Sequence, residues 1–307
     1  MATTVTAPVT NSIGLASRYL PLLDEVYKAE SKTAIFDMAD ERVRWIGAQS
    51  VYLFETDPVG LSAYSRNSGF VPGDVDTTWR QYTISQDRGR SFMVDAMDND
   101  ETLGMAFGTL LSEFERTKVV PELDCYRFAK YCDGAANAMK TTESISNANG
   151  AIAAIDTATE KLDDAEVPYE GRVLFVNPTV YKYIKGGVTR MIMNGDNNVD
   201  YNVEMFNDMR LIVVPSGRFN TVCTLGTPTS ASDAGGYTAA GTTINLMVVH
   251  PSAVMQVVKH VIPRTFSPEV NQEADAWKLD YRIYHDAFVK HNKTNGIYVS
   301  AASFPST

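Results

Sequence analysis

Alternating apolar and polar side chains mark two strand-like segments in the first third of the chain. Residues 43–54 and 79–95 both place their large apolar residues on one face, with polar residues between them. The residues that separate the two segments are rich in Gly, Ser, Pro and Asp, a composition typical of loops. We therefore expect an extended hairpin over residues 41–97. Because an isolated hairpin is only marginally stable, it needs a third strand or another surface, which a second subunit could supply.

After residue 98 the period of the apolar positions becomes helical. Apolar residues from Leu103 to Phe114 recur every three or four positions, and the stripe continues beyond them. This pattern predicts a long helix over residues 98–140, in which Pro121 should produce a kink or a break. A second amphipathic helix is expected over residues 149–164.

The middle and the end of the chain return to strands. The mixture of strands and a short helix indicates an α/β domain over residues 141–255. The alternation in the last third is that of a long half-buried strand, and we expect its Trp277 to be buried against the 98–140 helix. Strands are predicted at 172–178, 209–218, 243–251, 274–289 and 297–301, a short helix at 180–185 and a surface loop at 226–242.

The first 40 residues have the composition of an arm. They begin small, polar and Thr-rich, and then carry a short apolar stripe that includes Tyr19, Leu22 and Leu23. A segment of this kind cannot bury its stripe alone, so it is either disordered or lies on another surface. We expect these three residues to contact another subunit.

Three arginines in the second hairpin strand are further candidates for contacts between subunits. Arg80, Arg88 and Arg90 lie on a projecting hairpin of a chain whose formal net charge is −10. Positive side chains there would suit an acidic surface, for example that of a second copy. A solvated polar face explains the three arginines equally well.

The composition is that of a folded protein, with 44% hydrophobic and 21% charged residues in a chain of 307. No stretch of about 18 apolar residues occurs, which argues against a membrane span. The first residues lack the basic and apolar segments of a secretory signal, so we expect synthesis in the cytoplasm. The acidic balance excludes a dedicated DNA-binding protein, whose positive stripes would neutralise phosphates.

The three cysteines support a reducing compartment. Cys125 and Cys132 are separated by about 10 Å in the predicted helix, which is too far for a disulfide. Together with Cys223 they are expected to be small buried side chains.

Motifs for catalysis or for cofactor binding are not found in the sequence. There is no phosphate-binding GxxxxGK[ST], no GxGxxG after a strand, no HExxH, no Cys/His pair at zinc spacing and no GxSxG. His285 and Asp286 are neighbours on a predicted strand, so their side chains should point to opposite faces. We therefore predict no catalytic residue, no metal site and no cofactor, although a Ser–His–Asp arrangement could still assemble in space.

Five segments of the chain, in this order of elements, carry a family resemblance. The chain resembles the major capsid proteins of tailed phages, whose shared fold takes its name from phage Hong Kong 97. The similarity runs from about residue 40 to residue 301, and the last segment is the most specific because it is long and of mixed composition. The segments are VPELDCYRFAKY (120–131), RVLFVNP (172–178), LIVVPSGR (211–218), HPSAV (250–254) and QEADAWKLDYRIYHDAFVKHNKTNGIYV (272–299).

The resemblance implies an α+β, HK-97-like capsid fold and the function of a major capsid protein. Such a subunit forms the pentamers and hexamers of an icosahedral shell around double-stranded DNA, which it contacts only non-specifically. A separate scaffolding protein, a portal and a decoration protein would be its other partners, with no membrane, and its place would be the virion. The implied parts are an N-terminal arm (1–40), an extended hairpin loop (41–97), a spine helix of the peripheral domain (98–140), an axial domain (141–255) and the returning strands of the peripheral domain (256–307).

Two other functions remain open at this point. The first is an α/β enzyme whose active site, in residues 141–255, is not recognisable from motifs. A deep pocket with strongly perturbed pKa values would favour it. The second is a structural component of a phage tail or connector, which rings or tubes in place of closed shells would favour.

Overall fold

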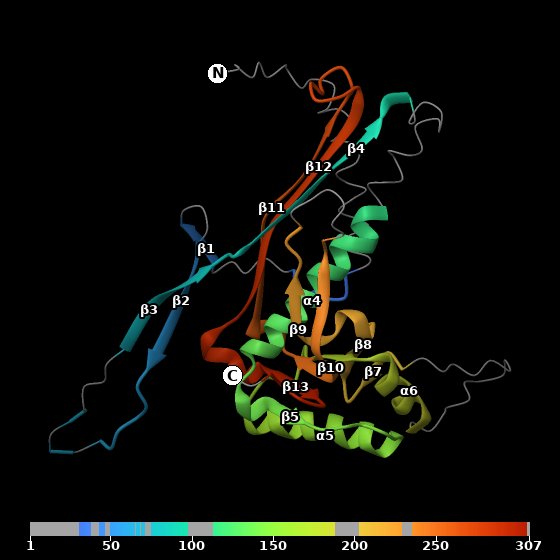
Figure 1. Ribbon diagram of the computed structural model, residues 1–307. Coiled ribbons are helices and arrows are strands. Elements are labelled where there is room, and N and C mark those ends of the chain that lie inside the picture. Colours follow the sequence, from blue (N-terminus) through green and yellow to red (C-terminus); the bar gives the residue numbers. More distant parts are fainter. Residues whose placement is uncertain are drawn as a thin grey trace, which may run out of the picture. The chain divides into compact units, whose positions relative to one another are not determined.

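The computed structural model describes residues 31–37, 43–46, 50–64, 66–67, 69–70, 75–97, 113–187, 203–228 and 235–305. The chain divides into two compact units, a smaller one of residues 38–86 and a larger one of residues 1–37 and 87–307. The expected hairpin region 41–97 is therefore shared between the two units. Figure 1 shows the strands and helices of both.

The smaller unit contains a three-stranded antiparallel sheet. Its strands are β1 (Val43–Ile46), β2 (Ser50–Pro58) and β3 (Val75–Thr83), in the order β1-β2-β3. The prediction of one strand over 43–54 is wrong, because β1 and β2 pair with each other from Val43 opposite Leu53 to Ile46 opposite Ser50. The third strand that the hairpin needs thus comes from the same chain.

The prediction of one strand over 79–95 is also wrong. β3 ends at Thr83, and β4 (Gln86–Asp95) belongs to another sheet, in which it lies beside β12 (Ala276–Val289), with β11 (Val254–Phe266) at the opposite edge. The strand predicted at 274–289 is confirmed as β12. β11 contains Pro263, which an edge strand tolerates because a missing N–H costs no ladder hydrogen bond there.

The next element after β4 that the structure describes in full is a helix of the larger unit. A π-helical turn over Glu115–Val119 leads directly into α4 (Val120–Gly134). Pro121 lies in the first turn of α4, where it causes no break, and the N–H of Val120 bonds to the carbonyl of Glu115, five residues back. The helix ends at Gly134, earlier than predicted, where an added Cβ would lie 2.6 Å from Val289 Cγ2 on β12. Residues 98–112 of the predicted helix lie outside the described residues.

The larger sheet has strand order β5-β13-β10-β6-β8-β7, with β9 paired to β10. β6 is buried on both faces. Val173 and Phe175 point into the cluster that contains Phe128 of α4, while Leu174 and Val176 point into the cluster formed with α5 and α6. The elements are β5 (Lys140–Thr142), α5 (Ala148–Asp164), β6 (Val173–Val176), α6 (Pro178–Gly187), β7 (Met205–Phe206), β8 (Met209–Val213), β9 (Asn220–Leu225), β10 (Tyr237–Val249) and β13 (Ile297–Ala301).

Several expectations for this region are confirmed and others are corrected. The helices predicted at 149–164 and 180–185 correspond to α5 and α6. The predicted loop 226–242 is partly strand, since β10 begins at Tyr237. The last strand joins β10 and β5 in the larger sheet, so the block 256–307 contributes to two sheets. Short 3-10 turns lie at Ala34–Phe36, Asn137–Met139, Ser216–Arg218, Pro251–Ala253 and His291–Gly296. No helix in the described part of the chain has the length and apolar character needed to cross a membrane.

Candidate functional site

His250 forms the contact that most resembles part of a catalytic centre. Its Nδ1 lies 2.7 Å from Ser252 Oγ and accepts a hydrogen bond from the backbone N–H of Ser252 at 3.2 Å. Nε2 lies 3.2 Å from the carbonyl oxygen of Glu170, so it carries the proton and donates to that oxygen. Burial lowers the pKa of His250 and keeps the ring neutral. Because a backbone carbonyl takes the place of an orienting carboxylate, the contact caps the turn that begins at Pro251 and does not build a triad.

His285 and Asp286 form no dyad. His285 is 1% exposed and packs edge-on against the ring of Tyr126, and burial lowers its pKa to about 3. The Asp286 carboxylate accepts hydrogen bonds from Tyr126 Oη at 2.7 Å and from the backbone N–H of Ala287 at 2.8 Å. Within the described ranges, no three His, Cys, Asp or Glu side chains are grouped so that they could hold a metal ion.

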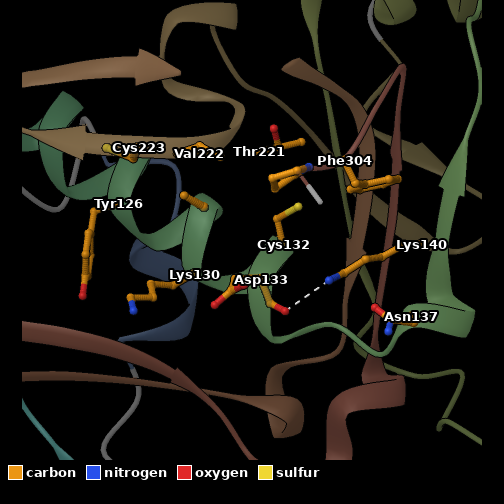
Figure 2. Close-up of a pocket in the computed structure, with 12 residues that line it drawn as sticks. Tyr126, Lys130, Cys132, Asp133, Asn137, Lys140, Thr221, Val222, Cys223 and Phe304 are labelled. Carbon is orange, nitrogen blue, oxygen red and sulfur yellow. Dashed lines mark hydrogen bonds between the residues drawn. The ribbon is translucent and has the colours of Figure 1, made fainter. Parts of the chain in front are cut away.

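A cavity of about 430 Å³ lies beside α4 and β9. Figure 2 shows residues that line it, among them Cys132, Lys130 and Lys140. Burial raises the pKa of Cys132 to about 11, so its thiol stays protonated at neutral pH and is a poor nucleophile. The amine of Lys140 donates to the carbonyl oxygen of Asp133 at 3.2 Å, and that of Lys130 lies 5.7 Å from the ring centre of Tyr126. These groups therefore stabilise the cavity walls and do not activate one another.

The three cysteines are free thiols. Cys125 and Cys132 are buried as expected, whereas Cys223 is half-buried, which corrects that part of the prediction. A hydrogen bond to Cys223, together with burial, raises the pKa of Cys125. The pair that comes into contact is therefore Cys125 with Cys223, from α4 and β9, and the sequence spacing of Cys125 and Cys132 gave no sign of it.

Arg80 forms an ion pair within the smaller unit. Its Nε lies 3.0 Å from Glu55 Oε2, and Tyr82 Oη donates to the other carboxylate oxygen at 3.2 Å. Glu55 is buried on β2, so the two β3 side chains satisfy a carboxylate that would otherwise be costly to bury. Arg80 remains partly exposed, with 42% of its side chain accessible.

Arg88 is used inside the larger unit. Its Nε lies 2.7 Å from Glu122 of α4, and its two terminal nitrogens donate to the carbonyl oxygens of Gly226 and Gly236 at 2.6 and 3.2 Å. Arg88 therefore joins β4 to α4 and to the turn region before β10. Arg90 lines the same cavity of about 300 Å³ as Arg88. Tyr19, Leu22 and Leu23 lie outside the described residues.

Exposed aromatic side chains on the smaller unit were missed at the sequence level. Phe54 and Trp79 face each other across β2 and β3, with ring centres 5.1 Å apart, and are 46% and 50% exposed. Phe54 alternates with the buried Val51 and Leu53 of its own strand, and Trp79 lies opposite Phe54 on β3, so both rings lie on the outer face. Further along the same unit, Val59, Leu61, Tyr64 and Phe70 are exposed as well.

Neither protein-family models nor curated proteins match the sequence. The fold does match solved structures. A structure from Mycobacterium phage Che8 aligns at 14% identity and a TM-score of 0.57 over 87% of this chain and 95% of that chain. A chain of the mature capsid of bacteriophage PhiM1 aligns at 13% identity and a TM-score of 0.57 over 83% of this chain and 82% of that chain. A chain of the capsid of the cyanophage P-SCSP1u aligns at 12% identity and a TM-score of 0.58 over 87% of this chain and 91% of that chain.

Proposed function

We propose that this chain, which has the α+β, HK-97-like capsid fold, is the major capsid protein of a tailed phage. It would assemble with copies of itself into the icosahedral shell that encloses the double-stranded DNA. The observation that carries this proposal is the fold match over 83% and 87% of the chain to chains of the PhiM1 and P-SCSP1u capsids. The absence of catalytic motifs in the sequence agrees with a structural role.

The exposed aromatic residues support self-association. A unit of residues 38–86 can bury few of its side chains, and Phe54, Trp79 and Phe70 remain open to solvent. A second copy would cover them and stabilise the folded state by mass action. We assign the inter-subunit role first to these side chains. Arg80 keeps a secondary role because it is partly exposed, whereas Arg88 is committed within the larger unit.

The family organisation supplies the remaining parts of the proposal. Pentamers and hexamers would be the capsomers, and a scaffolding protein, a portal and a decoration protein would be the other partners. Synthesis would take place in the host cytoplasm and the mature place would be the virion. The parts would be the arm (1–40), the extended loop (41–97), the spine helix (98–140), the axial domain (141–255) and the returning peripheral strands (256–307).

Negative-stain electron microscopy of the purified protein tests this function. The chain is expressed alone and together with the scaffolding gene that neighbours its own, and closed shells are expected in at least one preparation. Rings or tubes in both would indicate a tail or connector component. Particles that stay monomeric in both preparations, together with turnover of a substrate, would indicate the enzyme.

A further inference from the structure

Residues 31–37 make polar contacts with one buried carboxylate of α4. Asp124 is fully buried, and its side chain accepts hydrogen bonds from Ser31 Oγ at 2.8 Å and from Thr33 Oγ1 at 2.9 Å. The backbone N–H groups of Lys32 and Thr33 donate to the same carboxylate at 3.1 and 3.3 Å. Four donors of one short segment therefore converge on a single side chain.

Two further side chains, from α4 and β11, bind the same segment. Arg127, also fully buried, donates to Thr33 Oγ1 at 2.9 Å and lies 3.2 Å from Asp37 Oδ1. Gln256 of β11 donates to the carbonyl oxygen of Thr33 at 3.1 Å and is itself bonded to Tyr131 Oη at 2.6 Å. The N–H, the carbonyl and the hydroxyl of Thr33 are thus all hydrogen-bonded to these three side chains. We call Asp124, Arg127 and Gln256 the anchor site.

The buried carboxylate of Asp124 needs the hydrogen bonds that segment 31–37 donates. Burying a carboxylate without partners costs folding free energy. Among the described residues, Asp124 forms one ion pair, with Arg218 at 3.4 Å. The segment also contributes apolar contacts, because Phe36 belongs to the main hydrophobic cluster and Ile35 packs against it. Phe36 is buried against the rings of Tyr131 and Phe175, with ring centres 6.2 and 5.8 Å away. The segment is therefore held by directional hydrogen bonds to the anchor site and by one buried ring.

We infer that the anchor site is a peptide-binding site whose ligand is the chain's own segment 31–37, held as a separable element. The site recognises two hydroxyl side chains spaced two residues apart, followed by an aromatic and an acidic residue. This inference rests on the proposed function and deepens it, because the site fixes the point from which residues 1–30 can reach other copies. Asp124 and Arg127 are then positioning residues for the arm.

Limited trypsin digestion of the full-length chain tests the anchor site at Lys32, whose peptide bond to Thr33 lies inside it. In the Asp124→Asn variant an amide NH₂ replaces one acceptor oxygen, and we expect cleavage after Lys32 to accelerate at least tenfold. Thr33→Val should accelerate it too, because it removes the hydroxyl that bonds both Asp124 and Arg127. The double variant should cleave more slowly than the product of the two single accelerations predicts, because the two changes share the Asp124–Thr33 contact. Asp133→Asn, an exposed carboxylate on the same helix, is the matched control and should cleave like the wild type.

Hydrogen exchange of the same variants separates a bound peptide from an ordinary part of the core. A separable segment predicts that Asp124→Asn exposes the amides of residues 31–37 while the amides of α5 and β6 keep their protection. Equal loss of protection in all three would overturn the inference, and so would unchanged cleavage at Lys32. Neither measurement requires shells, so a wild-type chain that never assembles would refute the proposed function and leave this test intact.

Discussion

At the scale of single residues, Arg172 shows how one buried cation can organise a loop. Its Nε donates to the carbonyl of Pro168 at 3.0 Å, and one terminal nitrogen lies 2.6 Å from both the Val167 carbonyl and Asp163 Oδ1. The guanidinium also stacks 5.2 Å from the ring centre of Tyr169. The loop between α5 and β6 therefore wraps around a side chain that is almost completely buried.

Arg172→Met should destabilise the subunit by about 2–4 kcal/mol, because two loop carbonyls and a carboxylate lose their donor together. Urea denaturation monitored by tryptophan fluorescence measures this difference. Arg116→Met is the control, since the Arg116–Glu113 pair is exposed and worth less than about 1 kcal/mol. Equal midpoints for the two variants would show that the loop holds itself without Arg172.

His285 predicts a pH dependence of stability. Burial keeps its folded-state pKa at about 3, while an unfolded chain has the ordinary value of 6.5. Between these values the unfolded state binds a proton that the folded state does not, so the stability present above pH 6.5 falls as the pH drops. The slope from this residue is about 1.4 kcal/mol per pH unit.

The His285→Leu variant should remove this contribution to the slope, and its Nδ1 has no hydrogen-bond partner within the described residues that the change would orphan. Urea midpoints at pH 7 and pH 5 are to be compared for the wild type, His285→Leu and His291→Gln. His291→Gln, at an exposed position after β12, is the control for the loss of a histidine side chain. A His285→Leu variant as acid-sensitive as the wild type would assign the slope to other groups.

At the scale of elements, Trp277 links β12 to β4. It is half-buried, and it packs with Leu279 of its own strand and with Phe92 and Val94 of β4. The sequence predicts that it is fully buried against the 98–140 helix, and the structure corrects the burial.

Trp277→Ala should therefore lower the free energy of unfolding by about 1–3 kcal/mol, less than the roughly 3–5 kcal/mol of a fully buried aromatic. Leu279→Ala, at a fully buried position, should lower the urea midpoint at least as much. Insoluble Trp277→Ala protein beside soluble Leu279→Ala protein would contradict this order.

The elements that the sequence predicted well are those whose apolar period ends at a clear signal. α5 and β12 were placed almost to the residue for this reason. The breaks between β1 and β2 and between β3 and β4 were missed, because alternation continues through a turn and does not reveal which strand is the partner. The same limit hid the partners of the arginines. Glu55 lies 25 residues from Arg80, and Glu122 lies 34 residues from Arg88, so only the fold brings them together.

At the scale of the whole molecule, net charge and exposed apolar surface act in opposite directions on self-association. Each copy carries a formal charge of −10, so two copies repel each other at long range. Short-range contacts must therefore overcome this repulsion. The apolar side chains of the smaller unit are suited to that role, because burying them stabilises the contact whatever the net charge.

Trp79→Ser should therefore separate assembly from folding. The side chain is half exposed in the subunit, so its loss should lower the urea midpoint only slightly. In a contact between copies an aromatic anchor is worth about 2 kcal/mol or more, which corresponds to an approximately 30-fold higher protein concentration for shell formation. Gln81→Ala, an exposed position on the same strand, is the matched control and should assemble like the wild type. Light scattering against protein concentration measures the threshold. Shells of Trp79→Ser at the wild-type threshold would show that the Phe54–Trp79 pair stays in solvent after assembly, and that copies meet through another surface.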